Sequence, residues 1–355
     1  MSAPRVWFVD ILRLIASFQM INGHTLDAVL VTSIRQGVFY ERYLWTRGLV
    51  SVSFLAVAGI AFHLSTLARF EKHKSNPVAV KRRFRRALII VLVGYALSFP
   101  FGAFKSDPEL QRLAWFYFRS VGVLQCIGTS LIMLEMITLL AKTKQQVVVA
   151  SAILAAVFFA LAPAGDGLVR DGQPQALLNW LSHQGGSQFP LLPWSGFVFA
   201  GLVVGAIAMP DAGRTPFFVV LGRLLGITAV CAVSWQLAEA VSFGFFDAAI
   251  HHASSAPAKS LEKLTAVFAL IFVLAVLSRP IRTLPAVLRA LSSETLTIFA
   301  VHLMVLFYPG IAIARRFDHR LPLSWALLVS AGMVIFTCGY AYAWHRWKTR
   351  GQRRH

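Results

Sequence analysis

The chain alternates between long apolar runs and short polar connections that are mostly basic. A helix needs about 20 apolar residues to cross the hydrocarbon core of a bilayer, and only closed backbone hydrogen bonding is tolerated there. The pattern predicts ten spans, at about 6–25, 45–68, 86–104, 114–140, 146–163, 190–209, 216–240, 262–278, 293–313 and 322–345. We therefore expect an all-α, polytopic membrane helix bundle that forms a single domain over residues 1–355.

The composition agrees with this pattern. Hydrophobic residues make up 57% of the chain and charged residues only 14%, whereas a soluble domain carries about 25% charged residues. The first apolar run begins near Met1, but it contains Asp10 and Arg13 and lacks a small-residue cleavage site. We expect it to be a mature span and not a signal peptide.

The formal net charge is +19, from 34 basic and 15 acidic residues. A nucleic-acid binder would need a soluble basic face, and here the charge clusters between apolar runs, so no nucleic-acid partner is expected. With the N-terminus in the cytoplasm, the inward segments hold 20 basic residues and the outward loops hold 10. This bias predicts that both termini are cytoplasmic. It rests mainly on KHKSNPVAVKRRFRR and on the tail KTRGQRRH, which is also expected to contact anionic lipid.

Ionisable residues inside the predicted spans mark a candidate working site, because such groups are costly in lipid and usually face a bundle interior. Four of them lie near predicted span ends, where they can also extend to the interface. The three cysteines fall inside apolar runs without metal or redox spacing, so no metal site is expected. The ionisable residues are Asp10, Arg13, His24, Arg47, His63, Arg119, Arg223, Glu239 and His302.

Asp10 and Arg13 are three residues apart on one helix face, so they can neutralise each other. The pair either fixes the first span against its neighbours or contributes to a ligand site. A rise of 1.5 Å per residue places His24 about 16 Å from Arg13 and about 21 Å from Asp10. No catalytic triad can therefore form within the first span.

His24 lies at the outward end of the first span, after Asn22 and Gly23, where we expect the helix to loosen. An imidazole titrates near neutral pH and suits a general base, although a histidine at a helix end can also be an ordinary interfacial residue. Its partner must come from another helix. His302 and Arg119 are the candidates, and His302 can equally be a satisfied core histidine.

Several segments, taken in order, resemble one family. They are RVWFVDILRLIASFQMINGH, SVSFLAVAGIAFHLS, VKRRFRRALIIVLVGYALS, VGVLQCIG, FPLLPWSGFVFAGLVVGAI and LSSETLTIFAVHLMVLF, spread over about residues 5–310. Together they resemble the bacterial proteins related to heparan-α-glucosaminide N-acetyltransferase, within the wider transmembrane acyltransferase superfamily that includes acyltransferase family 3. Arg13-Leu14 departs from the Arg-Gly of that pattern, and Phe299 stands where tyrosine is common.

The resemblance implies acyl transfer across the bacterial inner membrane, from cytoplasmic acetyl-CoA or another acyl-CoA to a sugar hydroxyl or amine of an outward glycan or glycolipid. No metal is implied. His24 would remove the acceptor proton directly or carry the acyl group covalently. Asn22, Arg119 or His302 would stabilise the tetrahedral intermediate, and Asp10 and Arg13 would lie at the cofactor end or in the scaffold.

A basic patch at the predicted cytoplasmic mouth of the third span suits the phosphates of CoA, although membrane orientation alone also explains it. It comprises Lys81, Arg82, Arg83, Arg85 and Arg86.

Two other classes of function stay open. A secondary transporter would use Asp10, Arg13, Arg119 and His302 as a proton or substrate pathway, and it predicts paired halves that the sequence does not show. A non-catalytic component of polysaccharide export would leave His24 without a role. The small-residue segments AGI and GLVVG suggest that a homodimer can form.

Overall fold

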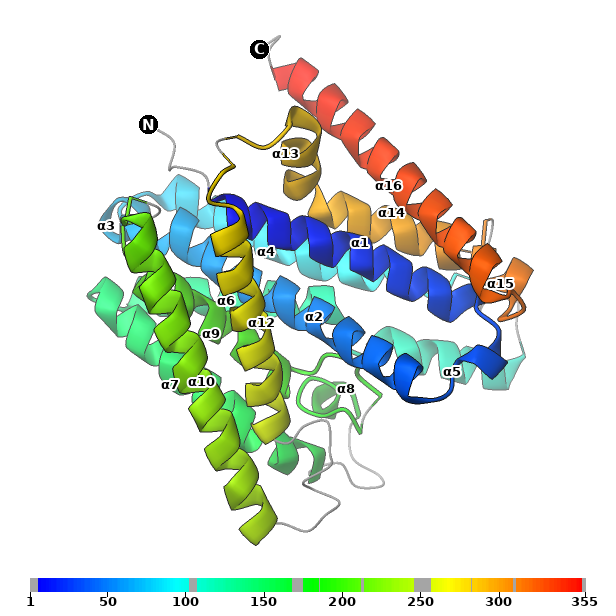
Figure 1. The fold of residues 1–355 in the computed structure, drawn as a ribbon, viewed down its shortest axis with the longest axis horizontal. Helices are drawn as coiled ribbons and strands as arrows, with labels where there is room; N and C mark the ends of the chain where they lie inside the picture. Colours follow the sequence, from blue (N-terminus) through cyan, green and yellow to red (C-terminus); the bar gives the residue numbers. More distant parts are fainter. Residues whose placement is uncertain are drawn as a thin grey trace. The chain divides into compact units, whose positions relative to one another are not determined.

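The computed structural model describes residues 6–101, 107–167, 175–184, 186–211, 214–245, 257–281, 283–308 and 311–352. These residues form helices and their connections, with one isolated bridge between Leu30 and Leu321. The all-α class is therefore confirmed. In chain order (Figure 1) the helices are α1 (Trp7–Val29), η1 (Thr32–Ile34), α2 (Val38–Ser65), η2 (Leu67–Arg69), α3 (Phe70–Lys74), α4 (Pro77–Leu97), α5 (Pro108–Arg119), α6 (Val123–Leu140), α7 (Lys144–Gly167), α8 (Gln175–Leu178), α9 (Leu191–Ala208), α10 (Phe217–Phe245), α12 (Pro257–Leu277), α13 (Ala286–Ser293), α14 (Thr295–Phe307), α15 (Ile313–Phe317) and α16 (Leu323–Gln352).

Fewer helical segments than the ten predicted spans meet a test of length and apolar character, and the count of ten stays a prediction. Within the described residues, seven helical segments are long and apolar enough to cross a bilayer, and α13 with α14 forms an eighth, bent by 74°. The remaining two predicted spans correspond to α1 and α4, which are helices but do not reach the same apolar character. The physical reason is charge: α1 carries Asp10 and Arg13, and the first half of α4 carries five basic residues.

The fourth predicted span is interrupted. Asp107 caps α5 by accepting hydrogen bonds from the next turn at 3.0 Å, and the helix ends at Arg119. In the gap before α6, the backbone N–H of Val121 donates to Ser187 Oγ at 2.8 Å, and its carbonyl accepts from the Phe189 N–H at 3.0 Å. These partners satisfy the backbone groups that the break exposes, so Arg119 lies at the end of α5, at a break inside the apolar segment Pro108–Leu140.

The chain divides into two compact units. The first, unit 1, contains Met1–Val6 and Phe54–Val276, and the second, unit 2, contains Trp7–Ser53 and Leu277–His355. Whether they act as the single domain predicted above stays a prediction.

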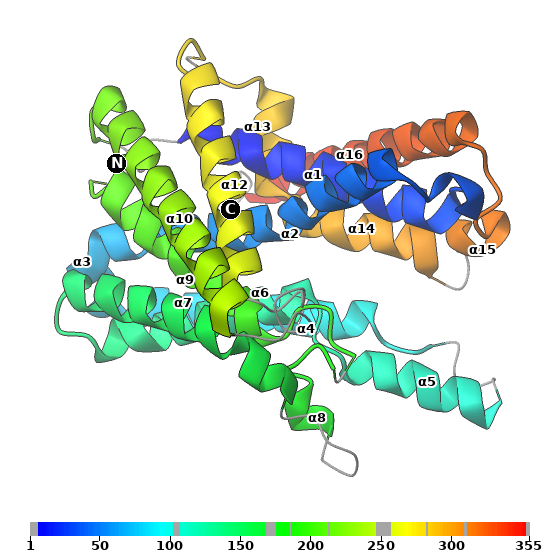
Figure 2. The ribbon, with the colours of Figure 1, turned by 60° about the horizontal axis from the view of Figure 1, so that its bottom comes forward.

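Unit 1 is built on close helix pairs: α7 packs on α9, and α4 packs on α6 (Figure 2). The closest approach joins the end of α2 to α9, where a Cβ on Gly59 would lie 1.9 Å from the Val198 carbonyl oxygen. A Cβ on Gly201 would lie 2.0 Å from the carbonyl oxygen of Ala56. The glycines of AGI and GLVVG thus serve packing inside the chain. They no longer support a homodimer, which stays a prediction.

Unit 2 is centred on α1, which packs against α14 and, antiparallel, against α16 (Figure 1). The chain after α1 is tied to the start of α16 through backbone hydrogen bonds of 2.9 Å between Val31 and Leu321 and between Leu321 and Val29. Further along, Ser330 on α16 bonds Asn22 on α1. Because the helices are antiparallel, α1 begins at the end of the unit where α16 ends. That both termini are cytoplasmic stays a prediction.

Candidate active site

The helix that carries His24 is longer than the sequence suggested. We expected α1 to loosen at Asn22 and Gly23 and to end near residue 25, but it continues unbroken to Val29. Arg35 explains the stable end, because its guanidinium donates to the carbonyl oxygens of Asp27 and Leu30 at 2.5 and 3.0 Å. These are carbonyls that a helix end leaves without partners. His24 is therefore held on a regular helix, more than one turn before its end.

His24 and His302 are brought together in unit 2. Their ring centroids are 5.4 Å apart, with the rings tilted by 33°. His24 on α1 is partly exposed, whereas His302 on α14 is completely buried. Phe299, one turn before His302, packs edge-on against its ring at 5.5 Å. The structure thus places His302, one of the two predicted partners, beside His24.

The hydrogen bonding of His302 defines its chemistry. Nδ1 lies 3.0 Å from the carbonyl oxygen of Ile298, one turn earlier on α14, so Nδ1 is the protonated donor of the neutral ring. Nε2 then carries the lone pair and points away from the α14 backbone. Nε2 is buried and has no hydrogen-bond partner among the described residues. A buried acceptor without a partner is costly, which makes this nitrogen a candidate for a role in chemistry.

A charged pair flanks His24. Asp27 follows it by one helical turn and binds Arg47 of α2 through two contacts, Nη1 to Oδ1 at 2.6 Å and Nη2 to Oδ2 at 2.5 Å. The arginine side chain crosses α1 at Gly23, where a Cβ would lie only 2.8 Å from Arg47 Nε. The sequence left open that Arg47 only extends to the membrane interface. In the structure its side chain is held beside Gly23, the residue that precedes His24.

Asn22 faces a different helix from His24. Its Oδ1 accepts a hydrogen bond from Ser330 Oγ of α16 at 2.7 Å. Two residues along a helix correspond to a rotation of about 200°, so Asn22 and His24 project from nearly opposite sides of α1. The structure therefore does not bring Asn22 and His24 together, and an oxyanion role for Asn22 stays a prediction.

The other end of α1 carries a separate set of ionic contacts. Asp10 and Arg13 form the predicted ion pair, with 3.7 Å between Oδ1 and Nη1, and Asp10 is buried. Nearer the end of α16, Glu294 binds Lys348 and accepts from His345 Nδ1 at 3.0 Å. Lys348 belongs to the basic tail, so part of that tail is anchored within the protein.

The remaining predicted residues lie in unit 1. The basic patch occupies the first turns of α4, whose start is capped by Asn76 accepting from the Ala79 N–H at 3.0 Å. Arg119 ends α5, and its carbonyl oxygen accepts from Asn179 Nδ2 at 3.2 Å. The described patch consists of three exposed arginines, Arg82, Arg85 and Arg86, with Arg83 partly buried and Lys81 exposed. Their roles toward CoA or an oxyanion stay predictions.

Sequence reasoning missed a buried histidine–carboxylate pair in unit 1. His73 Nε2 on α3 lies 2.5 Å from Glu135 Oε1 on α6, and both side chains are buried. The signal was present, because Glu135 is a lone carboxylate in the apolar run LIMLEMITLL. Within the part of the chain that the structure describes, no group of three His, Cys, Asp or Glu side chains could hold a metal ion.

Fold and site together define the class of this protein: a multi-pass α-helical membrane protein with paired histidines on two packed helices. Comparison with protein families then gives the particular group. The family model described as heparan-alpha-glucosaminide N-acetyltransferase, catalytic, matches residues 5–221, and the chain belongs to this family. Membership indicates a membrane-embedded acetyltransferase. The match includes His24 and ends before α14. No curated protein matched the sequence.

Proposed function

We propose that this protein transfers an acyl group, acetyl in the first instance, from cytoplasmic acyl-CoA to a sugar. The acceptor is a hydroxyl or amine of a glycan or glycolipid on the outward face of a bacterial inner membrane. The observation that carries the proposal is the contact between His24 and His302, with centroids 5.4 Å apart, in a chain of an acetyltransferase family.

His24 is the general base in this scheme. A ring nitrogen of His24 removes the proton of the acceptor O–H or N–H as the acceptor atom attacks the thioester carbon. The tetrahedral intermediate then collapses, the carbon–sulfur bond breaks, and the proton passes from His24 to the departing CoA sulfur. In the covalent variant, neutral His24 attacks the thioester carbon, the carbon–sulfur bond breaks, and the ring N–H proton leaves with the CoA sulfur. The acceptor then attacks the acyl-imidazole, the carbon–nitrogen bond breaks, and the acceptor proton passes to the freed imidazole.

His302 supports this step as a second proton acceptor. Its Nδ1 is committed to the Ile298 carbonyl, so the unpartnered Nε2 is the atom that can share the proton taken by His24. In this tautomer neutral His302 accepts and does not donate at Nε2, so the negative oxygen of the intermediate needs another donor. Arg47, fixed against Gly23, is the cation of the same unit that we assign to that task.

The test is acyl transfer by the full-length protein in nanodiscs, with labelled acetyl-CoA on one side and a panel of amino sugars and glycans as acceptors. His24→Ala is expected to lose about 10²–10⁴-fold in rate while still binding acetyl-CoA. The matched control is His319→Asn, which removes an exposed histidine at the same end of unit 2; the Arg35 guanidinium lies 2.8 Å from His319 Nδ1, and the asparagine side chain also offers an acceptor there. His319 has a positive φ of 57°, which asparagine tolerates, so this variant should retain full transfer.

A folded His24→Ala protein with unchanged transfer would contradict the proposal. Saturable transport of a solute without acetyl-CoA consumption would favour the transporter alternative instead. An acyl adduct on His24 trapped after mixing with acetyl-CoA alone would identify the covalent variant.

A further inference from the structure

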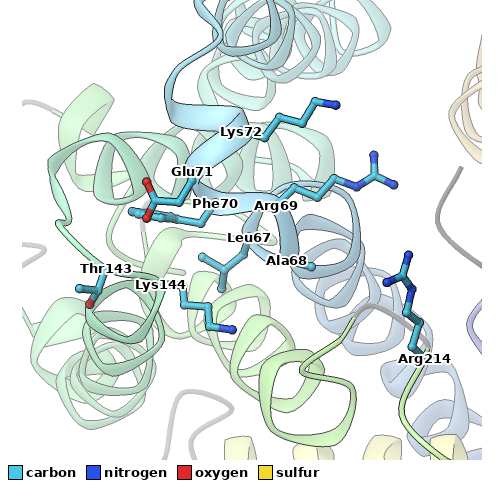
Figure 3. Close-up of a pocket in the computed structure, with 9 residues that line it drawn as sticks. All are labelled: Leu67, Ala68, Arg69, Phe70, Glu71, Lys72, Thr143, Lys144 and Arg214. Carbon is cyan, nitrogen blue, oxygen red and sulfur yellow. The ribbon is translucent and has the colours of Figure 1, made fainter. Parts of the chain in front are cut away.

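Unit 1 contains an open pocket that the proposed reaction does not use. It lies where three connections between helices meet: η2 with the start of α3, the turn from α6 to α7, and the segment between α9 and α10. Its volume is about 680 Å³, within the range of small-molecule sites, which is about 300–1,000 Å³. The lining residues are Leu67, Ala68, Arg69, Phe70, Glu71, Lys72, Thr143, Lys144 and Arg214 (Figure 3).

Four cations from these three separate connections converge on the pocket: Arg69, Lys72, Lys144 and Arg214. Figure 3 shows the guanidinium groups of Arg69 and Arg214 on one side, with the Glu71 carboxylate on the opposite side. One carboxylate against four cations leaves a local excess of positive charge.

These cations are not neutralised by the protein. Among the described residues, no ion pair joins any of the four to a carboxylate, and Glu71 forms none either. Bringing like charges together around a concave surface raises the local potential and attracts anions. Clustering of this kind is unfavourable for the empty protein, so its presence points to an anionic ligand.

Membrane orientation explains why these connections are basic, since all three lie on the predicted cytoplasmic side. Orientation requires only a count of charges, however, and does not require them to surround one hollow. A single phosphate is satisfied by one or two arginine or lysine side chains. Four cations from three connections match a ligand that presents two or more phosphates.

We infer that the pocket bounded by Arg69, Lys72, Lys144 and Arg214 is a binding site for a ligand carrying at least two phosphate groups. That chemistry has two sources at a cytoplasmic membrane face: a soluble bisphosphate or diphosphate, and the headgroup of a lipid with two phosphates. The site is distinct from the α4 arginines to which sequence analysis assigned CoA. It does not rest on acyl transfer at His24, because binding here needs no chemistry there.

The experiment measures binding to the full-length protein in nanodiscs of neutral lipid. The soluble probe is adenosine 3′,5′-bisphosphate, followed by titration calorimetry, and the lipid probe is cardiolipin added to the nanodisc and followed by thermal stability. The test variant is Lys144→Gln with Arg214→Gln. The matched control is Lys142→Gln with Arg350→Gln, which removes the same charge from exposed positions outside the pocket.

Each charge-assisted contact is worth about tenfold in affinity, so the test variant should bind about 100-fold more weakly, and the control within about twofold of wild type. If the test variant loses binding of the bisphosphate only, the ligand is the soluble one. If it loses stabilisation by cardiolipin only, the ligand is the lipid headgroup. Equal binding by test and control variants would overturn the inference, as would no response of the wild type to either probe. His24→Ala should bind like wild type, which separates this result from any failure of the acyltransferase proposal.

Discussion

Two contacts of buried histidines, His73 with Glu135 and His302 with His24, differ in the group that faces the imidazole. In unit 1, His73 faces a carboxylate, Glu135, at 2.5 Å. In unit 2, His302 faces a second imidazole, His24, and its remaining contacts are the Ile298 carbonyl and the Phe299 ring. One pair is an acid with a base, whereas the other is two bases side by side.

The difference separates structural from chemical use of the same side chain. A carboxylate holds a neighbouring imidazole and its proton in one arrangement, which stabilises a fold. In the other pair, two imidazoles compete for one proton. Each pair leaves one buried acceptor without a hydrogen-bond partner among the described residues, Nε2 of His302 and Oε2 of Glu135, so the second base and not the open acceptor distinguishes the two pairs. We therefore interpret the contact of His73 with Glu135 as structural, joining α3 to α6, and the contact of His24 with His302 as a site for proton transfer.

The largest expected effect is on stability in unit 1. Glu135→Ala removes one partner of a buried pair, and breaking such a pair costs about 3–5 kcal/mol. Thermal and denaturant unfolding in detergent should show this loss, with transfer per folded molecule unchanged. The double variant His73→Leu with Glu135→Leu replaces the pair by apolar groups, so it should recover most of the stability. If Glu135→Ala instead reduced transfer and left the stability unchanged, the contrast between the two pairs would be wrong.

The next effect is on chemistry in unit 2. His302→Phe keeps an aromatic ring beside His24 and Phe299 but removes the proton acceptor. We expect acyl transfer to fall about 100-fold, equivalent to about 2.7 kcal/mol, with the melting temperature nearly unchanged. His302→Gln retains an acceptor at the end of its side chain and should restore part of the rate. A normal rate for His302→Phe would show that His24 acts without it.

The smallest effect concerns the cation beside His24. Arg47→Gln should reduce transfer about tenfold, because a donor to the negative oxygen is lost. It should reduce stability by no more than about 1 kcal/mol, since the Asp27 and Arg47 side chains are 34% and 24% exposed. Arg42→Gln, an exposed arginine on the same helix, is the matched control. If both variants lose rate equally, general charge near the membrane and not Arg47 is responsible.

Much of the fold could be predicted because apolar length is a local property of the chain. The spans at α7, α9 and α12 follow directly from their runs of apolar residues. The break between α5 and α6 could not be found in this way, since it depends on Ser187, more than 60 residues later. The end of α1 was predicted too early because His24 and Asp27 are polar, although Arg35 supplies the carbonyls with donors.

The residues of the candidate site could be predicted better than the contacts between them. His24 and His302 stood out as ionisable residues in apolar runs, but they are 278 positions apart in the sequence, which hides whether they meet. The orientation of Asn22 toward Ser330, and the fixing of Arg47 by Asp27, depend on packing between helices that no local pattern encodes. Of His73 and Glu135, only the glutamate could be recognised in the sequence, as a lone carboxylate in an apolar run.

The antiparallel contact of α1 with α16 has a consequence for how the protein is made. α1 leaves the ribosome before its partners within unit 2, α13, α14, α15 and α16. The contacts of His24 with His302, and of Asn22 with Ser330, can therefore form only after α14 and α16 have been translated. A chain shortened to residues 5–221, the region matched by the family, would carry His24 without His302.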